Sequence, residues 1–498
     1  MKNIILFFFL ISINLTANII TVGKNGDYGS LSEAVSIVHP GDTLFLFPES
    51  HINNQYIENL HGTESKPIYI LADTNRQAVF SGGNQAIHFV NVSWLDISGL
   101  VFEKQKINGV NIDDGGDYST PSHHIRIEHC LWRGMDVSGN NDELKMSGVD
   151  SFSIRFNTFS NGSSGGSLVD MVGCHYGVFE NNHFVNAGSN CIQAKGGTRY
   201  IKIYRNYFKN GGRRSINCGG STDLPYFRPI DVGYEGKNID IYSNIFIGST
   251  AAIAFVTATE CRFINNTVIN PGRWIARVLQ ETDDERFIEC GNNIFSNNIC
   301  YFNNDADHEG GINVGDNTHL EIFEFFNNLW YNTDNPLWNG PNYSFCHRNS
   351  IVNRNPMFVD IDNENFMLDS LSPAINSGKS YDGIEFDYYG KPFKTTRAIG
   401  AVEYKPDNIS SISRRNEKHD LIISPALAGD YIILKGDSDE DVFIYNITGE
   451  CLLKVDKSLQ TSSNDFGNGE ERCINVSTLP TGVYILRSGR NILKFIKL

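Results

Sequence analysis

One short stretch of the sequence carries residues that could bind and transform an anionic substrate. Residues 211–229, GGRRSINCGGSTDLPYFRP, hold three arginines and one aspartate, although the chain of 498 residues has a formal net charge of −16. The planar fork of arginine matches a carboxylate or a sulfate. A single such cation is often a solvated turn residue, but five gather in this stretch and the next long loop: Arg213, Arg214, Arg228, Arg273 and Arg277. This clustering predicts an anionic ligand.

Polar residues next to this stretch are expected to share one strand face. The segments LKMSG, VDMVG, IQAKGG and INCGG alternate apolar and polar residues. If their first apolar residues point into a core, strand alternation turns the next residue outward. The outward residues are then Lys145, Asp170, Gln193, Asn217 and, two positions after Gln193, Lys195. We expect a polar column, walled by the long loops 211–236, 271–291 and 303–318.

These residue types suit β-elimination on a uronic-acid polymer. A cation neutralises the carboxylate, a base removes the adjacent proton, and an acid protonates the departing oxygen. Lys195 and Lys145 are the base candidates, because arginines nearby would lower a lysine pKa. Tyr226 is the acid candidate, with Arg228 or Arg214 as the carboxylate clamp. His175 is a second base candidate, although a histidine in a turn is more often structural.

Two other functions use different residues. A glycoside hydrolase needs two carboxylates about 5 to 9.5 Å apart, for which the candidates are Asp142, Glu143, Asp170 and Glu281. A non-catalytic glycan-binding or adhesive protein would expose aromatic platforms, for which Trp132, Trp274, Trp330 and Trp338 are available. No metal site or cofactor is predicted, although calcium could bind the acidic turn of Asp305, Asp307 and Glu309.

A recurring asparagine signature gives the organisation of the chain. Short alternating segments such as FSIRFNTFSNG and IKIYRNYFKNG repeat, and the equivalent asparagines are Asn157, Asn182, Asn206, Asn244, Asn266, Asn298, Asn328 and Asn349. Their separations range from 21 to 38 residues, and the segments lack helical periodicity. Stacked strands with asparagines in equivalent turns predict a parallel β-solenoid.

With these motifs, the chain resembles the exported right-handed parallel β-helix proteins of bacteria, which include polysaccharide lyases and glycoside hydrolases. The resemblance covers residues 18–404, from the opening TVGKNGDYGSLSEAVSIVHPGDTLFLFPES to the closing NPMFVDIDNENFMLDSLSPAIN. Residues 140–208 are similar to the lyases that include alginate lyases and chondroitinase-B-like enzymes. The catalytic lysine expected near Val172 is missing, the calcium-holding acids are not clearly matched, and Lys195 falls near a functional arginine of that family. The resemblance therefore implies a metal-independent lyase.

The two ends of the chain resemble export signals. Residues 1–17, with an apolar run from Ile4 to Ile13, are typical of a secretory signal peptide rather than a membrane anchor. After a polar linker at 405–420, residues 421–498 resemble the sorting domain of the Bacteroidetes type IX secretion system, through LPTGVY at 479–484 and the terminal Lys494 and Lys497. A small carbohydrate-binding β-sandwich is the alternative for this domain.

The sequence thus predicts an all-β protein, a right-handed parallel β-helix followed by a small β-sandwich. We expect a secreted or surface-attached monomer that uses the type IX secretion machinery and cleaves an anionic polysaccharide. The acidic composition argues against nucleic acid as a partner. The ten cysteines are scattered singly, so most are expected to be small buried side chains rather than disulfides.

Overall fold

The computed structural model contains two compact units. One is made of residues up to Glu403 and the other runs from Tyr404 to Leu498. The structure describes residues 17–72, 78–282 and 284–404, and in the second unit 422–424, 427–428, 431–435, 441–446, 451–455, 471–480, 482–488 and 491–497. The predicted linker and all but the last residue of the predicted signal peptide lie outside these ranges.

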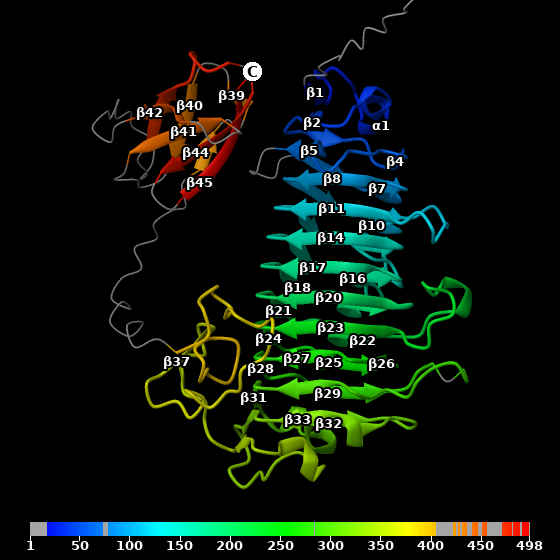
Figure 1. Cartoon of the computed structure of the whole chain (residues 1–498), viewed down its shortest axis with the longest axis vertical. Coiled ribbons are helices and arrows are strands. Elements are labelled where there is room, and N and C mark those ends of the chain that lie inside the picture. Colours follow the sequence, from blue (N-terminus) through cyan, green and yellow to red (C-terminus); the bar gives the residue numbers. More distant parts are fainter. Residues whose placement is uncertain are drawn as a thin grey trace, which may run out of the picture. The chain divides into compact units, whose positions relative to one another are not determined.

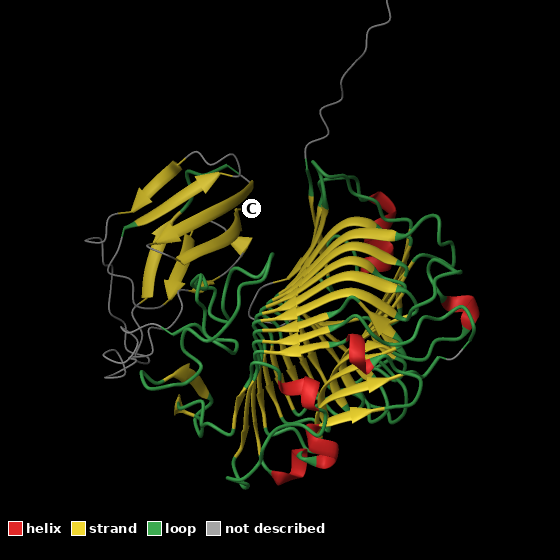
Figure 2. Ribbon diagram, turned by 60° about the horizontal axis from the view of Figure 1, so that its bottom comes forward, coloured by secondary structure: helices red, strands yellow, loops and turns green. Residues whose placement is uncertain are grey.

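The first unit is a parallel β-solenoid of about thirteen turns, which confirms the predicted fold class. Each coil adds one strand to each of three sheets, so the strands stack in ladders along the unit (Figures 1 and 2). The first sheet has the order β1 (Ile19–Val22), β2 (Thr43–Leu46), β5 (Ile68–Ala72), β8 (Ser93–Ser98), β11 (Ser122–Glu128), β14 (Val149–Arg155), β17 (His175–Glu180), β20 (Thr198–Tyr204), β23 (Gly236–Tyr242), β27 (Arg262–Ile264), β30 (Ile294–Ser296) and β33 (Glu324–Phe326), and β26 (Ala258–Thr259) also pairs with β23.

The other two sheets follow the same direction of stacking. The second sheet contains β4 (Gln55–Glu58), β7 (Gln85–Val90), β10 (Asn108–Asp113), β13 (Leu144–Ser147), β16 (Ser167–Val172), β19 (Asn190–Lys195), β22 (Arg214–Gly219), β25 (Ala251–Val256), β29 (Trp274–Leu279) and β32 (Ile312–Val314). The third contains β3 (Ser50–His51), β6 (Ala78–Ser81), β9 (Leu100–Glu103), β12 (Leu131–Arg133), β15 (Thr158–Ser160), β18 (His183–Val185), β21 (Tyr207–Lys209), β24 (Ile245–Ile247), β28 (Thr267–Ile269), β31 (Ile299–Phe302), β34 (Leu329–Asn332) and β35 (Ile351–Val352).

Helices are short and lie at the ends and in the loops. The helix α1 (Leu31–Ala34) and the 3-10 turn η1 (Val35–Ile37) precede β2. The remaining 3-10 turns are η2 (Leu224–Tyr226), η3 (Asn304–Ala306), η4 (His308–Gly311), η5 (Leu320–Ile322) and η6 (Ser344–His347). No helix among the described residues is long and apolar enough to span a membrane.

Inside the coils, aromatic side chains of successive coils stack on one another. Trp132, Phe159, Phe184, Phe208 and Phe246 follow each other on the third sheet with ring centroids 4.4–5.1 Å apart. Eight of the nine cysteines recorded as free thiols are buried, which confirms the prediction for most of them. The four tryptophans available as binding platforms are also buried. Core packing is what the strand positions of Trp132 and Trp330 favour, and Trp274 and Trp338 do not form exposed platforms either.

A ladder of buried asparagines turns each coil from the first sheet to the third. The side-chain oxygen of Asn206 accepts from the backbone N–H of Asn182 at 2.9 Å and from its amide at 3.0 Å. The Asn206 amide in turn donates to Phe179 O at 2.9 Å and to the Asn244 oxygen at 3.1 Å. The same pattern links Asn157 through Asn328. Asn349 was expected to continue it, but Ser350 Oγ accepts from Asn328 N instead.

Residues after the last coil fold back along the outside of the solenoid. The hairpin of β36 (Phe358–Asp360) and β37 (Asn365–Leu368) lies in this segment (Figure 1). Phe366, Ala401 and Val402 pack against Ile245 and Ile269. Glu364 accepts from Tyr207 Oη at 2.5 Å and from Lys209 Nζ at 2.6 Å. The segment therefore covers the apolar outer face of the third sheet.

The second unit contains two small sheets that are mainly antiparallel. One pairs β38 (Ile422–Ser424), β40 (Tyr431–Lys435) and β43 (Glu471–Asn475). The other has the order β39 (Leu427–Ala428), β45 (Asn491–Lys497), β44 (Gly482–Ser488), β41 (Val442–Asn446) and β42 (Cys451–Val455). Ile432, Val442, Ile444, Leu486 and Phe495 form its core. Its role as a sorting domain stays a prediction.

The ladder predicts a large stability cost for removing one member. Asn206→Ala should leave a buried N–H and two buried carbonyls with fewer partners, each costing about 1–3 kcal/mol. We expect the free energy of unfolding of the solenoid to fall by about 3 kcal/mol in urea titrations. Asn140→Ala, at an exposed asparagine before β13, is the control and should change it by less than about 0.5 kcal/mol. Equal effects would contradict a stabilising role for the ladder.

Candidate active site

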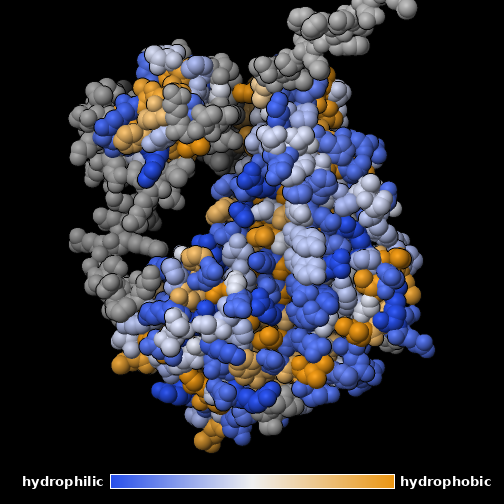
Figure 3. Space-filling view, viewed as in Figure 1, coloured by the Kyte–Doolittle hydropathy of each residue, from blue (hydrophilic) through white to orange (hydrophobic). Residues whose placement is uncertain are grey.

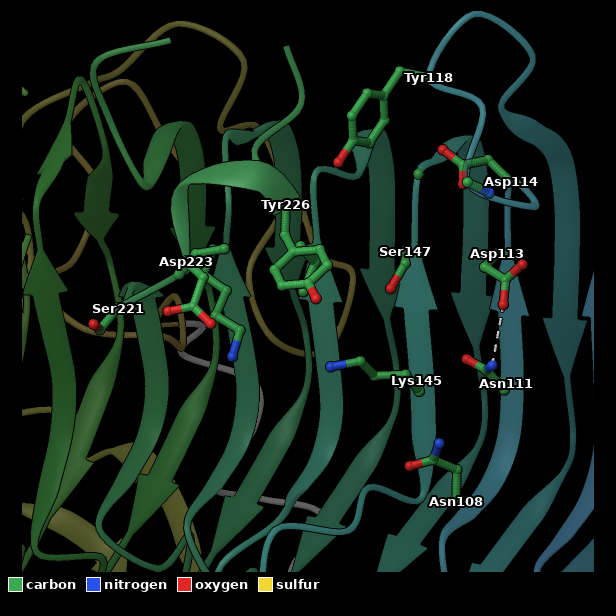
Figure 4. Close-up of a pocket in the computed structure, with 15 residues that line it drawn as sticks. Asn108, Asn111, Asp113, Asp114, Tyr118, Lys145, Ser147, Ser221, Asp223 and Tyr226 are labelled. Carbon is green, nitrogen blue, oxygen red and sulfur yellow. Dashed lines mark hydrogen bonds between the residues drawn. The ribbon is translucent and has the colours of Figure 1, made fainter. Parts of the chain in front are cut away.

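A polar cleft lies on the second sheet, where β10, β13, β16 and β19 end. It has a volume of about 550 Å³. Asn111, Asp113, Lys145, Ser147 and Lys195 form its floor, and Asp114, Tyr118, Asp223 and Tyr226 belong to its walls (Figure 4). The floor comes from strands and the walls from two loops. The cleft is therefore assembled from strands of successive coils, which pair in parallel register with one another.

The predicted polar column exists. Lys145 pairs in register with Asp170, Asp170 with Gln193, and Gln193 with Asn217. The column continues to Asn111 and His88 in one direction and to Ala254 and Arg277 in the other. Asn217, however, is only 1% exposed and donates to Gly219 O at 3.2 Å. Its predicted contact with substrate is therefore not possible in this structure.

Two lysines share one buried carboxylate at the floor of the cleft. The Lys145 ammonium donates to Asp170 Oδ2, and Lys195 Nζ lies 3.7 Å from Asp170 Oδ1. Burial alone would lower the pKa of Lys145, but the charges of Asp170 and Asp142 raise it above its usual value. The expected lowering by arginines is thus wrong for Lys145, which stays a cation. The side chain of Lys195 is 18% exposed and reaches the cleft.

The acids proposed for hydrolysis are not a free pair. Asp170 is occupied by the lysines, and Glu281 pairs with Arg214 at 3.1 Å. Glu143 is fully buried, which raises its pKa well above the usual range. Burial, followed by the charge of Asp170, raises the pKa of Asp142 to about 6. None of these four residues lines the cleft, so they do not supply a pair of exposed carboxyl groups there.

A single buried carboxylate fastens the insertion to the solenoid. Glu235 accepts from the N–H of Gly196 and Thr222 at 2.7 Å each, and from the hydroxyls of Thr222 at 2.7 Å and Thr282 at 2.9 Å. These donors come from a strand end, from the insertion and from the following long loop. Glu235, which the sequence did not indicate, therefore helps to hold the wall that carries Tyr226 in place.

Arg228 and His175 anchor the same insertion. The Arg228 guanidinium donates to both Asp150 carboxylate oxygens, at 2.6 and 2.8 Å, and to Gly173 O at 2.9 Å. His175 is buried against it, with Nε2 3.2 Å from Arg228 O. Burial and the charge of Arg228 lower the pKa of His175 to about 4. Neither residue lines the cleft, so the predictions of a clamp and a second base are wrong for them.

The other arginines lie away from the two lysines. Arg213 is exposed on the turn before β22. Arg273 and Arg277 lie over the Trp274 ring, 4.2 and 4.6 Å from its centre. Arg277 also donates to Asn313 at 2.8 Å. The predicted arginine-lined active site is therefore replaced by a lysine floor. Arg213 and Arg214 lie at the start of β22, one coil from β19 with Lys195, and Arg273 and Arg277 lie at β29, two coils farther along the sheet.

Tyr226 is where the sequence indicated, in the wall of the cleft. It ends η2 and is 61% exposed, and its hydroxyl points down toward the level of Lys145 (Figure 4). Opposite it, the loop after β10 carries Tyr118, which donates to Pro225 O at 2.8 Å. This hydrogen bond joins the two walls across the end of the cleft. The 114–121 loop was not predicted to take part.

Four further polar residues of this region were missed. His88 Nε2 lies 2.6 Å from Asp113 Oδ2, which also accepts from Asn111 at 3.1 Å. Burial would raise the pKa of Asp113, but the His88 hydrogen bond and the N–H of Gly115 outweigh it and lower that pKa. Burial raises the pKa of the neighbouring Asp114. The alternation of apolar and polar residues in VNIDD matches that in LKMS, and this pattern could have indicated the missed residues of that segment.

The acidic turn considered for calcium does not gather into a site. Asp307 accepts from the Trp338 indole at 2.8 Å and Glu309 from Asn313 at 2.6 Å, while Asp305 bonds within its own turn. In the part of the chain that the structure describes, no three His, Cys, Asp or Glu side chains are arranged to hold a metal ion.

Solved structures similar to this chain include polysaccharide lyases. An alginate lyase from Paenibacillus sp. str. FPU-7 is 16% identical over 60% of this chain and 97% of its own, with a TM-score of 0.39. A family PL6 polysaccharide lyase from Pseudopedobacter saltans is 13% identical over 74% and 96%, with a TM-score of 0.35. The A-module of a mannuronan C-5 epimerase from Azotobacter vinelandii is 15% identical over 65% and 93%, with a TM-score of 0.45.

The sequence itself matches no protein-family profile and no curated protein. At such low identities and TM-scores, the neighbours' activities do not transfer to this chain. The function is therefore argued from the cleft alone.

The lowered pKa of His175 predicts acid sensitivity. The imidazole is neutral in the folded state down to about pH 4, whereas unfolded histidine binds a proton below about pH 6.5. Its contribution to stability is therefore present above about pH 6.5 and is lost as pH falls toward 4. Between pH 7 and 4.5 the wild type should lose about 2 kcal/mol more than His175→Gln in urea titrations. Parallel losses in the two proteins would contradict a buried neutral His175.

Proposed function

We propose that this chain cleaves a uronic-acid-containing polysaccharide by β-elimination in the cleft. The observation that carries the proposal is the pair of ammonium groups, Lys145 and Lys195, that flank Asp170 below the phenol of Tyr226. The buried Asp170 carboxylate holds the two ammonium groups side by side, and both groups face the open space of the cleft. A substrate carboxylate can then approach the lysines from the side opposite Asp170.

The lysines supply neutralisation rather than base catalysis in this proposal. Contact of the substrate carboxylate with Lys195, supported by Lys145, makes the C–H next to that carboxylate acidic. The deprotonated phenol of Tyr226 removes this proton, the C–C double bond forms, and the bond to the glycosidic oxygen breaks. The regenerated phenol then gives the proton to the departing oxygen. Tyrosine can serve in both steps because its exposed ring stands over the cleft.

The test measures the ultraviolet absorbance of the new conjugated double bond on polygalacturonate and alginate. Lys195→Gln should lower kcat/KM about 100-fold through loss of charge stabilisation, and Tyr226→Phe by about 100-fold or more through loss of proton transfer. Lys24→Gln, an exposed lysine of the first coil, should keep the wild-type rate. Melting temperatures of all variants should stay within a few degrees. Full activity of Lys195→Gln would overturn the assignment.

Hydrolysis through Asp113 and Asp114 is the second candidate, favoured by one observation. The two carboxyls line the same cleft and their pKa values shift in opposite directions. An acid that stays protonated beside an ionised carboxylate is what glycoside hydrolysis requires. The wild type would then produce new reducing ends without the ultraviolet signal.

Under hydrolysis, Asp114→Asn should reduce the formation of reducing ends about 100-fold or more, because the proton donor is lost. Activity should also fall as pH rises through the raised pKa of Asp114, since only its protonated form donates. Asp136→Asn, an exposed acid outside the cleft lining, is the control. An ultraviolet signal that is unaffected by Asp114→Asn would instead exclude this candidate.

A further inference from the structure

A second groove lies on the first sheet, away from the cleft. It has a volume of about 490 Å³ and spans β17, β20, β23 and β27. Its floor consists of outward-pointing side chains at equivalent positions of successive strands of that sheet. Its wall consists of residues at another equivalent position, where the backbone turns. The floor residues are Val178, Lys202, Asp240 and Arg262, and the wall residues are Tyr176, Tyr200, Asn238 and Glu260. In Figure 3, which views this face, pale and orange atoms run between hydrophilic columns.

The wall position has a left-handed backbone in each coil. Its φ is 54° at Ser151, 59° at Tyr176, 59° at Tyr200 and 50° at Asn238. Small polar residues tolerate this conformation best, and a bulky residue here is an outlier. Tyr176 and Tyr200 nevertheless stand at this position, 56% and 42% exposed. They carry backbone strain without packing into the core, and such strain is typical of sites under functional constraint.

The two tyrosines form a fixed platform. Their rings stack with centres 5.0 Å apart and planes at 14°. The Arg199 guanidinium lies 5.6 Å from the Tyr200 ring centre. Ser151 occupies the equivalent position in the coil before Tyr176, so the outer face of the Tyr176 ring is not covered by another ring. A ligand can therefore bind aromatic surface that is already ordered, at small entropic cost.

The floor offers hydrogen-bonding groups and one available cation. Arg262 grips Asp240 with a two-pronged contact at 2.6 and 2.7 Å, which neutralises both. Lys202 is exposed and has no ion pair within the described part of the chain. An aromatic wall beside planar polar groups suits the C–H face and hydroxyls of a sugar ring, and the free ammonium suits an acidic substituent.

We propose that this groove is a second, non-catalytic binding site for the acidic polysaccharide. The choice of a uronate polymer rests on the function proposed above. Because the groove and the cleft lie on different sheets, the site binds a separate stretch of polymer and raises the local concentration of cleavable bonds. Its contribution should appear on long chains and vanish on short oligosaccharides.

The test uses native gels containing polygalacturonate or alginate, in a Tyr226→Phe background so that the polymer persists. Tyr176→Asn with Tyr200→Asn places in both coils the residue that the column carries at Asn238. We expect this double variant to bind the polymer at least about tenfold more weakly. Lys202→Gln should weaken binding of the polymer and should also make that binding less dependent on salt. Phe156→Asn is the matched control, since Phe156 is also exposed (44%) with φ of 54° but lies in another turn.

Activity assays with Tyr226 intact complete the test. The double variant should still convert short oligosaccharides to unsaturated products at an unchanged rate. Its activity on the polymer should fall. Equal retardation of parent and double variant, or no retardation of the parent by either polymer, overturns the second site and leaves the proposed function standing. An equal loss on short oligosaccharides also overturns it, because the substitutions would then act through the cleft. Retardation without any elimination product would instead overturn the proposed function.

Discussion

The ladder of buried asparagines is the constraint on which the rest of the first unit depends. Successive coils differ in length, with 22 residues between Asn244 and Asn266 and 38 between Asn206 and Asn244. Despite this, each asparagine donates its side-chain amide and its backbone N–H to the side-chain oxygen of the next. Strand side chains alternate, so a slip of one residue would turn an outward lysine into the core. The ladder prevents this, and the position of Lys145 beside Asp170 follows from it.

The cleft shows how an acidic chain presents cations. Lys145 and Lys195 are not left as bare charges on the sheet, because Asp170 lies between them and Asp142 lies 3.7 Å from Lys145. The wall above them is attached by Glu235, and Arg228 spans from the insertion to Asp150. Arg214, Arg228 and Glu235 of the insertion thus serve attachment. Only Tyr226 and a few short polar residues of this segment face the cleft.

The solenoid, the ladder and the polar column could be predicted because they depend on local periodicity. The alternation of apolar and polar residues is enough to predict the outward direction of Lys145 and Asp170. The hydrogen-bonding and ion-pair partners of the side chains could not be predicted, because they depend on where the long loops pack against the solenoid. Arg228 and His175 look like active-site residues by type, yet each is buried by the other. The pKa direction of Lys145 depended first on Asp170, which is close only once β13 and β16 pair. Asn349 matched the repeat in type, but the neighbouring Ser350 takes the ladder position.

The repeating hydrogen bonds of the ladder also bear on how such a chain can change length over evolution. Every internal asparagine offers the same acceptor to one side and the same donor to the other. A tandem duplication of one short segment, such as the 22 residues from Asn244 to Asn266, would insert a coil whose two interfaces already match its neighbours. The hydrogen bond between Tyr118 and Pro225 spans several coils. Insertion of a coil between these two residues would therefore separate the two walls of the cleft. Lengthening of the protein is therefore expected at coils outside it, which leaves the chemistry intact while the surface for long ligands grows.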